Sequence, residues 1–216
     1  MKKLKAALFD FDGTLVRSID VLVDLFEECL IEQSIKPIDR KEIRQLIGEP
    51  LDKIFQKLTN LVDVSHFSKN FRAKERAKHN ARYIPLVEGT IPTLEFLKSQ
   101  NLKLGIVSTK QRELIEPFSV ELGIEKFFDV VIGGNDVKKP KPDPEPILLA
   151  CKRLKVEPHE TIFVGDSLLD LAAAKKSGVI FIGVLTGTTT REVFEKKQAD
   201  YIFDNINKMT SLLERA

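Results

Sequence analysis

The sequence predicts an α/β fold in which a parallel β-sheet is covered by helices on both faces. Short apolar runs of strand length recur along the chain, and amphipathic segments of helix length separate the later runs. Strands that alternate with helices in this way are joined by crossover connections, which leave the strands parallel. The interval of about ninety residues between the first two runs is several times the usual crossover length and predicts an inserted unit.

Five apolar runs predict the strands of the sheet, and a sixth is a candidate edge strand. The five runs are residues 6–9, 102–107, 130–132, 161–164 and 181–184, and the edge candidate is 201–203. The amphipathic segments predict helices at residues 91–99, 113–122, 144–154 and 168–177.

Local residues mark the ends of these helices. Asp143 before Pro144 predicts a capping carboxylate followed by proline at the first helical position. Ser108 with Gln111 three residues later predicts a capping box. Two glycines stand where helix C-termini are expected, at Gly123 and Gly178.

The long interval after the first strand has its own helical periodicity. Apolar residues recur there at helical spacing, so we interpret residues 18–83 as an α-helical cap domain. The α/β core would then comprise residues 1–17 and 84–216, with hinges near 15–18 and 83–89. No repeat of fixed period is present in the sequence.

The composition is that of an ordinary soluble globular protein, with 43% hydrophobic and 31% charged residues. The formal net charge of +2 gives no reason to expect nucleic acid or an anionic membrane as partner. The first apolar stretch is too short for a signal peptide, and no uncharged apolar run could cross a bilayer. We therefore expect a cytoplasmic monomer or homodimer. Cys29 and Cys151 form no CxxC pair and are predicted to be buried apolar side chains.

Two acids stand close together at the end of the first strand. Asp10 and Asp12 are two residues apart, so an extended backbone points both carboxylates to one side. Gly13 permits a tight turn and the close approach of a ligand. Clustered carboxylates repel each other unless a cation offsets the charge, and Mg²⁺ with its oxygen ligands fits that need. The alternative is that the Asp-Gly pair only forms a turn after the strand.

Further polar residues follow two other strands, and a lysine lies in a loop. Asp166 ends the fourth strand and Asp170 lies one helical turn later, so both could complete a metal site or could be helix-start acids favoured by the dipole. Ser108 and Thr109 follow the second strand and could donate to phosphate oxygens. Lys141 lies in a proline-rich loop and is either a counter-charge for the reacting group or an exposed loop lysine.

The joint placement of these residues favours a single site. Ligands of open α/β sheets bind beyond the carboxyl ends of the strands, at the point where the strand order reverses. If the first strand is central, the strands that end near Ser108 and Asp166 flank it. Their side chains and Asp10 would then converge on one crevice.

These residues resemble the four motifs of the haloacid dehalogenase superfamily, in the expected order. The matching residues are Asp10-Phe11-Asp12-Gly13-Thr14-Leu15, then Ser108, then Lys141 before Pro142-Asp143-Pro144, and finally Gly165-Asp166 with Asp170. The helical insert resembles the type 1 cap, and the branch that the chain resembles most is the phosphoglycolate phosphatase group. The implied core is Rossmann-like, with strand order 3-2-1-4-5. Because the dehalogenases that name the superfamily lack the second aspartate, Asp12, the implied chemistry is phosphoryl transfer.

The resemblance also implies roles for the acids. Asp10 would attack phosphorus and form an aspartyl-phosphate, and Asp12 would act as general acid and then general base. Mg²⁺ would be held by the Asp10 carboxylate, the backbone carbonyl of Asp12 and Asp166, with Asp170 completing the metal site directly or through water.

The remaining residues would bind the phosphorylated substrate. Ser108 and Lys141 would hold the phosphoryl oxygens, with Gly13 and Thr109 as further substrate-binding residues. The expected function is a Mg²⁺-dependent phosphomonoester hydrolase that acts on a small phosphorylated metabolite, with phosphoglycolate favoured. The alternatives are a pyrophosphatase, a sugar-phosphate phosphatase, a phosphomutase or a binding protein that has lost activity, and the intact acids argue against the last.

The sequence departs from the superfamily pattern at two positions. Arg17 stands where many relatives have Asp, and Thr109 stands where Asn often follows the hydroxyl residue of the second motif. In the cap, residues 69–82 carry six Lys or Arg side chains and Glu75 as the one acid. This basic segment could attract anionic substrates or could be a solvated helix face.

Overall fold

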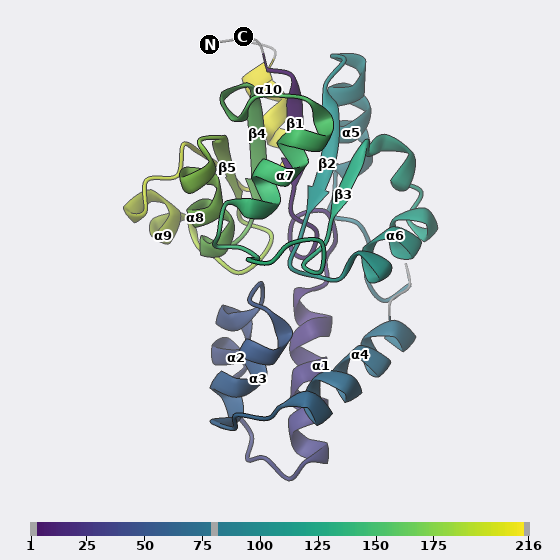
Figure 1. Cartoon of the computed structure of the whole chain (residues 1–216), viewed down its shortest axis with the longest axis vertical. Helices are drawn as coiled ribbons and strands as arrows, with labels where there is room; N and C mark the ends of the chain where they lie inside the picture. The colour runs from purple at the N-terminus through teal and green to yellow at the C-terminus, as the bar shows by residue number, and fades with distance from the viewer. Residues whose placement is uncertain (1–3, 79–81, 214–216) are drawn as a thin grey trace.

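A computed structural model describes residues 4–78 and 82–213, and it contains the predicted parallel sheet (Figure 1). The six strands are parallel and lie in the order β3-β2-β1-β4-β5-β6. Their bounds are β1 Ala6–Phe9, β2 Lys103–Val107, β3 Val130–Ile132, β4 Thr161–Gly165, β5 Ile180–Val184 and β6 Tyr201–Phe203. The expected order 3-2-1-4-5 is confirmed, and the sixth run forms the edge strand next to β5.

The sheet is buried on both faces. The side chains of β1 alternate between two hydrophobic clusters, one on each face. Ala7 and Phe9 pack in one cluster, and Ala6 and Leu8 pack in the other. The other strands and the helices that cover the sheet supply further apolar side chains to these clusters. The helices of the core are α5 Thr90–Ser99, α6 Arg112–Glu121, α7 Glu145–Leu154, α8 Leu168–Ser177, α9 Arg191–Lys196 and α10 Thr210–Leu213, with 3-10 turns η1 Glu125–Phe127, η2 Pro158–Glu160 and η3 Ile206–Met209.

The register of the sheet places the ends of three strands side by side. Phe9 of β1 pairs with Ile106 of β2 on one side and with Val164 of β4 on the other. The residues that follow these strands therefore meet at one edge of the sheet, as predicted for Asp10, Ser108 and Asp166.

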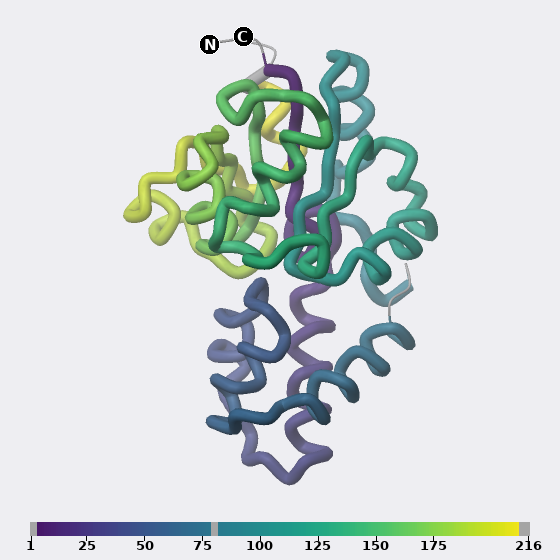
Figure 2. The backbone as a smooth tube through the Cα atoms, viewed as in Figure 1, coloured from purple at the N-terminus to yellow at the C-terminus, as the bar shows by residue number. Residues whose placement is uncertain are grey.

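Four helices form a separate body below the sheet (Figures 1 and 2). They are α1 Ile19–Glu32, α2 Arg40–Leu46, α3 Leu51–Thr59 and α4 Ser65–Lys78. Their apolar faces share a third hydrophobic cluster whose buried members all lie between Ile19 and Phe71. At its centre the rings of Phe26 and Phe71 have centroids 4.4 Å apart. A cluster of this kind is what the predicted cap domain requires, and its limits at residues 18–83 stay a prediction.

The two chain crossings between these bodies lie next to each other. Val16 and Leu86 form an antiparallel bridge, and the Arg17 amide donates a hydrogen bond of 2.9 Å to the Pro85 carbonyl. Both segments fall where the hinges are predicted. The insert therefore leaves the core and returns to it through one paired junction.

The predicted helix ends are confirmed in part. Gly178 ends α8 with φ 78°, and Gly123 follows α6 with φ 68°. Pro144 is the N-cap of α7 rather than its first helical residue, although the Asp143 carboxylate still accepts a hydrogen bond from the Glu145 amide.

The capping box predicted for Ser108 and Gln111 is wrong. Helix α6 begins at Arg112 after a turn, and the Gln111 side chain makes no capping hydrogen bond. The Arg112 amide is capped instead by Asn135 Oδ1 at 3.0 Å, from the loop that follows β3. The cap is supplied by a segment remote in sequence, so local spacing could not reveal it.

The cysteines lie as predicted, since Cys29 and Cys151 are free and buried in the cap and core clusters. Among the described residues, no helix is long and apolar enough to span a membrane.

Candidate active site

A cavity of about 240 Å³ lies between the carboxyl edge of the sheet and the helical insert. Its floor includes five of the predicted site residues, namely Asp10, Asp12, Ser108, Thr109 and Asp166. Its roof comes from α1, α3, α4 and the turn between α2 and α3, and it includes Leu22, Phe26, Phe71 and Arg72. The other predicted residues, Gly13, Lys141 and Asp170, are buried beside this floor rather than in the cavity lining.

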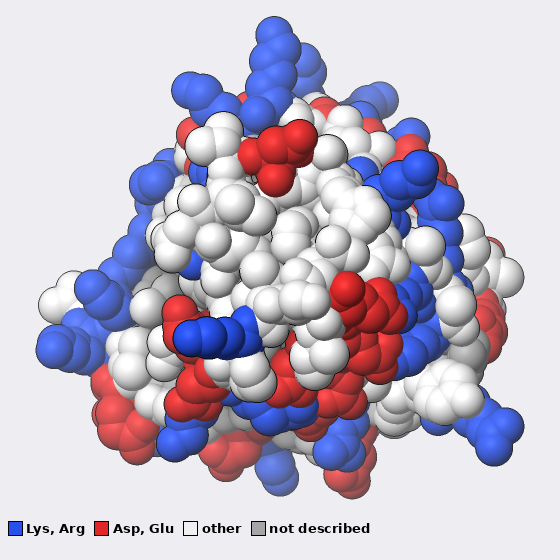
Figure 3. Space-filling view, turned by 90° about the horizontal axis from the view of Figure 1, so that it is seen from below, with Lys and Arg blue, Asp and Glu red and all other residues white. Residues whose placement is uncertain are grey.

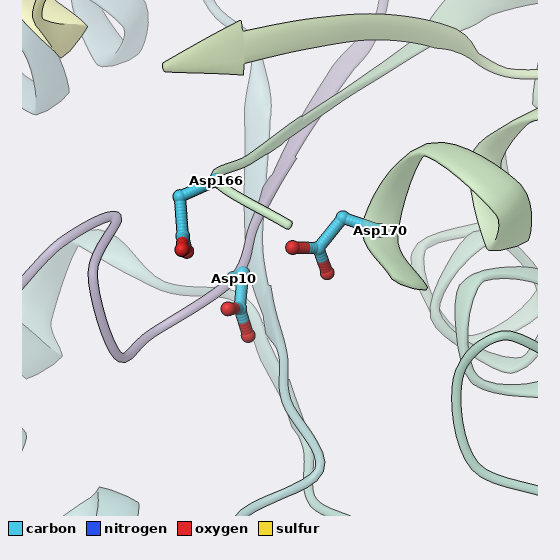
Figure 4. Close-up of side chains that lie close together, drawn as sticks. All are labelled: Asp10, Asp166 and Asp170. Atoms are coloured by element: carbon cyan, nitrogen blue, oxygen red, sulfur yellow. The ribbon is translucent and has the colours of Figure 1, made fainter. Parts of the chain in front are cut away.

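Three carboxylates lie close together, two in the floor of the cavity and Asp170 beside it (Figure 4). Asp10 follows β1, Asp166 follows β4, and Asp170 lies in the first turn of α8. All three are buried, and one oxygen from each lies within 4.8 Å of the others. Asp170 is fixed by a capping box, in which its Oδ2 accepts hydrogen bonds from the Ser167 amide and hydroxyl. Asp170 therefore caps the start of α8 and also belongs to the carboxylate cluster, so both interpretations of this residue are correct.

Lys141 provides the positive charge beside this cluster. Its Nζ lies 2.7 Å from Asp10 Oδ1 and 2.5 Å from Asp170 Oδ1, and it donates to the Val107 carbonyl at 3.2 Å. The side chain is 3% exposed, so the alternative of an exposed loop lysine is wrong. Burial alone would lower the pKa of Lys141, but the two carboxylates outweigh this and raise it. Lys141 is therefore charged at neutral pH.

The carboxylates lie in an environment that disfavours their charge. Burial raises the pKa of Asp10 to about 7, against the lowering effect of Lys141 and with a further increase from Asp170. Burial also raises the pKa of Asp166 well above its usual value, and the charges of Asp170 and Asp10 add to this. An additional cation would relieve the repulsion, and the all-oxygen donor set suits a hard divalent ion.

Asp12 faces the same cavity but lies outside the carboxylate cluster. Its Oδ2 lies 3.1 Å from Lys110 Nζ, and its buried Oδ1 has no hydrogen-bond partner within the described part of the chain. Phe9 and Phe11 pack into the core on the opposite side, as the extended spacing predicts. The Asp12 carboxylate therefore has one oxygen available to another group, and a metal role for its backbone carbonyl stays a prediction.

The loop after β5 holds Asp166 and was not recognised from the sequence. Thr14 Oγ1 donates to Asp166 Oδ1 at 3.0 Å, and the Thr188 amide donates to Oδ2 at 2.9 Å. Glycine is required on both sides of this carboxylate. A Cβ on Gly13, whose φ is +82°, would lie 2.9 Å from the carboxylate, and a Cβ on Gly187 would lie 1.8 Å from Oδ2. The signal that could have found this loop is the Gly-Thr-Thr-Thr run directly after an apolar strand.

Lys110 and Glu75 were also missed, and they join the insert to the core. Lys110 Nζ contacts Glu75 Oε1 of α4 at 2.5 Å, with side-chain exposures of 6% and 8%. Burial would lower the pKa of Lys110, but the charges of Asp12 and Glu75 raise it. The available signal was spacing, because Phe67, Phe71 and Glu75 recur every four residues on the buried face of α4.

The basic segment at residues 69–82 divides between two roles. Lys74 pairs with Glu32 at 2.7 Å and Lys78 with Glu28 at 2.5 Å, both partly exposed, as expected of a solvated face. Arg72 instead lines the cavity. From the end of the molecule that carries the insert, basic and acidic side chains alternate around an uncharged centre, with no large patch of one sign (Figure 3).

The two departures from the superfamily pattern differ in position. Thr109 lines the cavity beside Ser108, whose amide is fixed by the Ile132 carbonyl at 3.0 Å. Arg17 is exposed at the paired junction and is not part of the cavity lining.

Comparison with known proteins identifies the relatives of this chain. The family model "Haloacid dehalogenase-like hydrolase" matches residues 7–184. The pyrophosphatase PpaX of Bacillus velezensis is 34% identical over 212 residues, covering 98% of this chain and 96% of that protein. The phosphoglycolate phosphatase of Salmonella typhimurium is 30% identical, covering 99% and 94%. The crystal structure of a haloacid dehalogenase-like hydrolase from Bacteroides fragilis superposes with a TM-score of 0.88 at 36% identity, covering 96% and 100%.

Proposed function

The chain belongs to the haloacid dehalogenase-like hydrolase family, and from this premise we propose that it is a Mg²⁺-dependent phosphatase with Asp10 as nucleophile. The observation that carries the proposal is the group of buried charges at the sheet edge. Asp10, Asp166 and Asp170 have oxygens within 4.8 Å of one another, and Lys141 contacts two of them. The substrate class is a small phosphorylated metabolite.

Asp10 and Asp12 would divide the chemistry between them. A carboxylate oxygen of Asp10 attacks phosphorus while the bond from phosphorus to the leaving oxygen breaks, and Asp12 gives that oxygen a proton. A water molecule then attacks phosphorus and gives a proton to Asp12, and the bond to Asp10 breaks, which releases phosphate and restores both acids. The unpaired Oδ1 of Asp12 supports this role, because it is a buried oxygen with no competing partner among the described residues. Such proton transfers contribute roughly 10²- to 10⁴-fold.

Mg²⁺ is the cation that we propose for the carboxylate cluster. Asp10, Asp166 and Asp170 offer hard oxygen ligands, and the backbone carbonyl of Asp12 is a further donor. When bound, the ion would offset the repulsion between the nucleophile and the phosphate group. Lys141 and Ser108 would hold the phosphoryl oxygens, where negative charge is distributed in the transition state.

Phosphoglycolate is the favoured substrate, and pyrophosphate is the second candidate. Curated relatives named phosphoglycolate phosphatase and pyrophosphatase both match nearly the whole chain. The cavity of about 240 Å³ supports a small substrate in either case.

The test is release of phosphate from p-nitrophenyl phosphate, with and without Mg²⁺. We expect activity that requires the ion and that falls by at least about 10³-fold in Asp10→Asn, because the nucleophile is lost. Asp63→Asn, at an exposed cap position, is the control and should retain activity. Circular dichroism and thermal unfolding confirm that both variants fold. Unchanged turnover in Asp10→Asn would remove Asp10 as the nucleophile.

A further inference from the structure

Arg72 is a cation in the roof of the cavity whose charge is not matched by a neighbour. The side chain is half-buried on α4 and lines the cavity. Within residues 4–78 and 82–213, Arg72 has neither an ion pair nor a hydrogen bond. Its guanidinium carries five N–H donors, which must be satisfied by water or by a ligand.

The other cations near the cavity are already engaged. Lys110 is held between Asp12 and Glu75, and Lys141 is held between Asp10 and Asp170. Lys74 and Lys78 of α4 are not part of the cavity lining and pair with acids of α1. Arg72 therefore differs from its neighbours in both position and pairing.

The acids of the roof each have another partner, and within the described residues none of them is paired with Arg72. Glu49 pairs with Lys57 at 2.6 Å, Asp52 accepts from the Ser68 hydroxyl at 2.5 Å, and Glu75 pairs with Lys110. Most other roof residues are apolar, including Leu22, Phe26, Ile47 and Phe71. Low polarity around a guanidinium strengthens its attraction for an anion.

Arg72 lies opposite the floor of the cavity, where it would meet the leaving group of the substrate. On the proposed function, the phosphoryl group lies on the floor beside Asp10 and Ser108, so the rest of the substrate extends toward the roof. We propose that Arg72 is a specificity residue that binds a second anionic group, a carboxylate or a phosphate, on the leaving group. A guanidinium binds either anion through two parallel hydrogen bonds. The substrate class is then a small phosphate ester or anhydride with a second negative charge.

The experiment compares substrates that differ in this second charge. Values of kcat/KM are measured for phosphoglycolate, pyrophosphate and p-nitrophenyl phosphate, which carry a second carboxylate, a second phosphate and no second anion. The variants are Arg72→Gln, Arg72→Lys and, as a matched control, Arg76→Gln. Arg76 is an exposed residue of the same helix outside the cavity lining.

We expect Arg72→Gln to lower kcat/KM at least about 10-fold for one or both doubly anionic substrates, mainly through KM, because a charge-assisted hydrogen bond is lost. The doubly anionic substrate that shows the loss identifies the second group. The p-nitrophenyl phosphate value should change less than about threefold, and Arg72→Lys should retain part of the preference because it keeps the charge. Arg76→Gln should match the wild type on all three substrates.

Two results would overturn the proposal. An equal loss on all three substrates would show that Arg72 supports folding or closure, and unfolding temperatures would separate these cases. No loss on either doubly anionic substrate would exclude anion binding by Arg72. If the wild type releases no phosphate from any substrate with Mg²⁺ present, the proposed function itself is wrong and this inference is overturned with it.

Discussion

Lys141 places a positive charge in the interior of the core, where it touches the nucleophile candidate Asp10 and the helix-start acid Asp170. Removing one partner of a buried ion pair leaves the other charge uncompensated and typically costs about 3–5 kcal/mol. The same contacts hold the ammonium beside the oxygen expected to attack phosphorus. At this residue, stability and chemistry depend on one set of contacts.

The raised carboxyl pKa values predict how the stability of the metal-free protein depends on pH. The pKa of Asp10 is about 7 in the folded chain against 3.8 as its usual value, so between these values the folded state binds more protons than the unfolded state. The free energy of unfolding should therefore fall as pH rises from about 4 to 7. We expect Asp166→Asn to be more stable than the wild type at pH 8, because it removes a buried carboxyl whose own pKa is raised; each unit of that increase corresponds to about 1.4 kcal/mol.

Urea unfolding at pH 4 and pH 8 in the presence of a chelator measures this effect. The difference between Asp166→Asn and wild type should be largest at pH 8 and small at pH 4, where the raised pKa values keep Asp10 and Asp166 protonated in the wild type. With excess Mg²⁺, the order should reverse, because only the wild type keeps all three carboxylates for the ion. If Asp166→Asn is less stable than the wild type at pH 8 without metal, the carboxylates of the cluster do not repel one another as proposed.

The acids of the site could be predicted because each follows a strand within a local motif. Asp10 and Asp166 stand directly after buried apolar runs, and parallel strands bring such positions together. The contact between Lys110 and Glu75 could not be predicted in this way, because its partners lie 35 residues apart on different helical and loop segments. The ion pair depends on how the insert packs against the core, which no local pattern encodes.

At the level of elements, the loop between β5 and α9 acts as a clamp on Asp166. It contributes the Thr188 amide, and the Thr186 hydroxyl donates to the Gly13 carbonyl at 2.6 Å. Together with the Thr14 hydroxyl, which donates to Oδ1, the Thr188 amide gives each oxygen of Asp166 a hydrogen-bond donor. A carboxylate held this way is oriented before any ligand arrives.

Substitution of Gly187 should disturb this clamp without unfolding the protein. In Gly187→Ala, the new Cβ would meet Asp166 Oδ2 at 1.8 Å, so the loop or the carboxylate must shift. We expect at least about a 10-fold loss in Mg²⁺ affinity or kcat, because losing the hydrogen bonds that orient a metal-binding side chain typically has an effect of this size. The readouts are Mg²⁺ titration of activity and the unfolding temperature.

The control for this prediction is Gly178→Ala at the end of α8. A Cβ there meets nothing within 4 Å, although its φ of +78° makes the substitution mildly strained. Gly178→Ala should lower stability modestly and leave the kinetics unchanged. Equal kinetic effects of the two substitutions would argue against a specific clash at Asp166.

Strands were easier to predict than helix ends for a physical reason. A strand buried on both faces is a continuous apolar run, and the β1 and β3 bounds match the predicted runs. The start of α6 depends on Asn135, which reaches Arg112 from another loop. Local spacing at Ser108 and Gln111 carries no information about that distant cap.

At the level of the whole molecule, Glu75 is the residue through which the insert contacts the charges of the site. In Glu75→Gln, Lys110 would lose its charged contact with α4 and keep its contact with Asp12. We expect a loss of stability of about 1–3 kcal/mol and a higher KM with a smaller change in kcat, because the insert would be held less firmly over the cavity. Thermal unfolding and steady-state kinetics test both parts.

A matched control is Glu32→Gln, which removes a partner of Lys74 from an exposed surface pair. Surface pairs contribute little, so neither stability nor KM should change measurably. If Glu75→Gln and Glu32→Gln behave alike, the buried pair has no special part in positioning the insert.

The existence of the insert could be predicted from the length of the interval after β1, and its helical nature from periodicity. Its placement over the carboxyl edge of the sheet could not, because this depends on contacts between surfaces remote in sequence. Arg72 illustrates the limit. In the sequence it is one of the six Lys and Arg residues of the segment 69–82. The folded structure distinguishes it from Lys74 and Lys78, because Arg72 lines the cavity and the two lysines form surface ion pairs.

The paired junction at Val16 and Leu86 has a consequence for how such proteins can be modified. The chain leaves the core and returns to it at adjacent points, so the helical insert takes the place of one long loop. The insert therefore does not set the distance between β1 and α5. A shorter or longer roof could be grafted between residues 17 and 85 while the strand register below stays the same. The proposed catalytic floor and the helical roof are thus separate units that meet, along the chain, at the bridge between Val16 and Leu86.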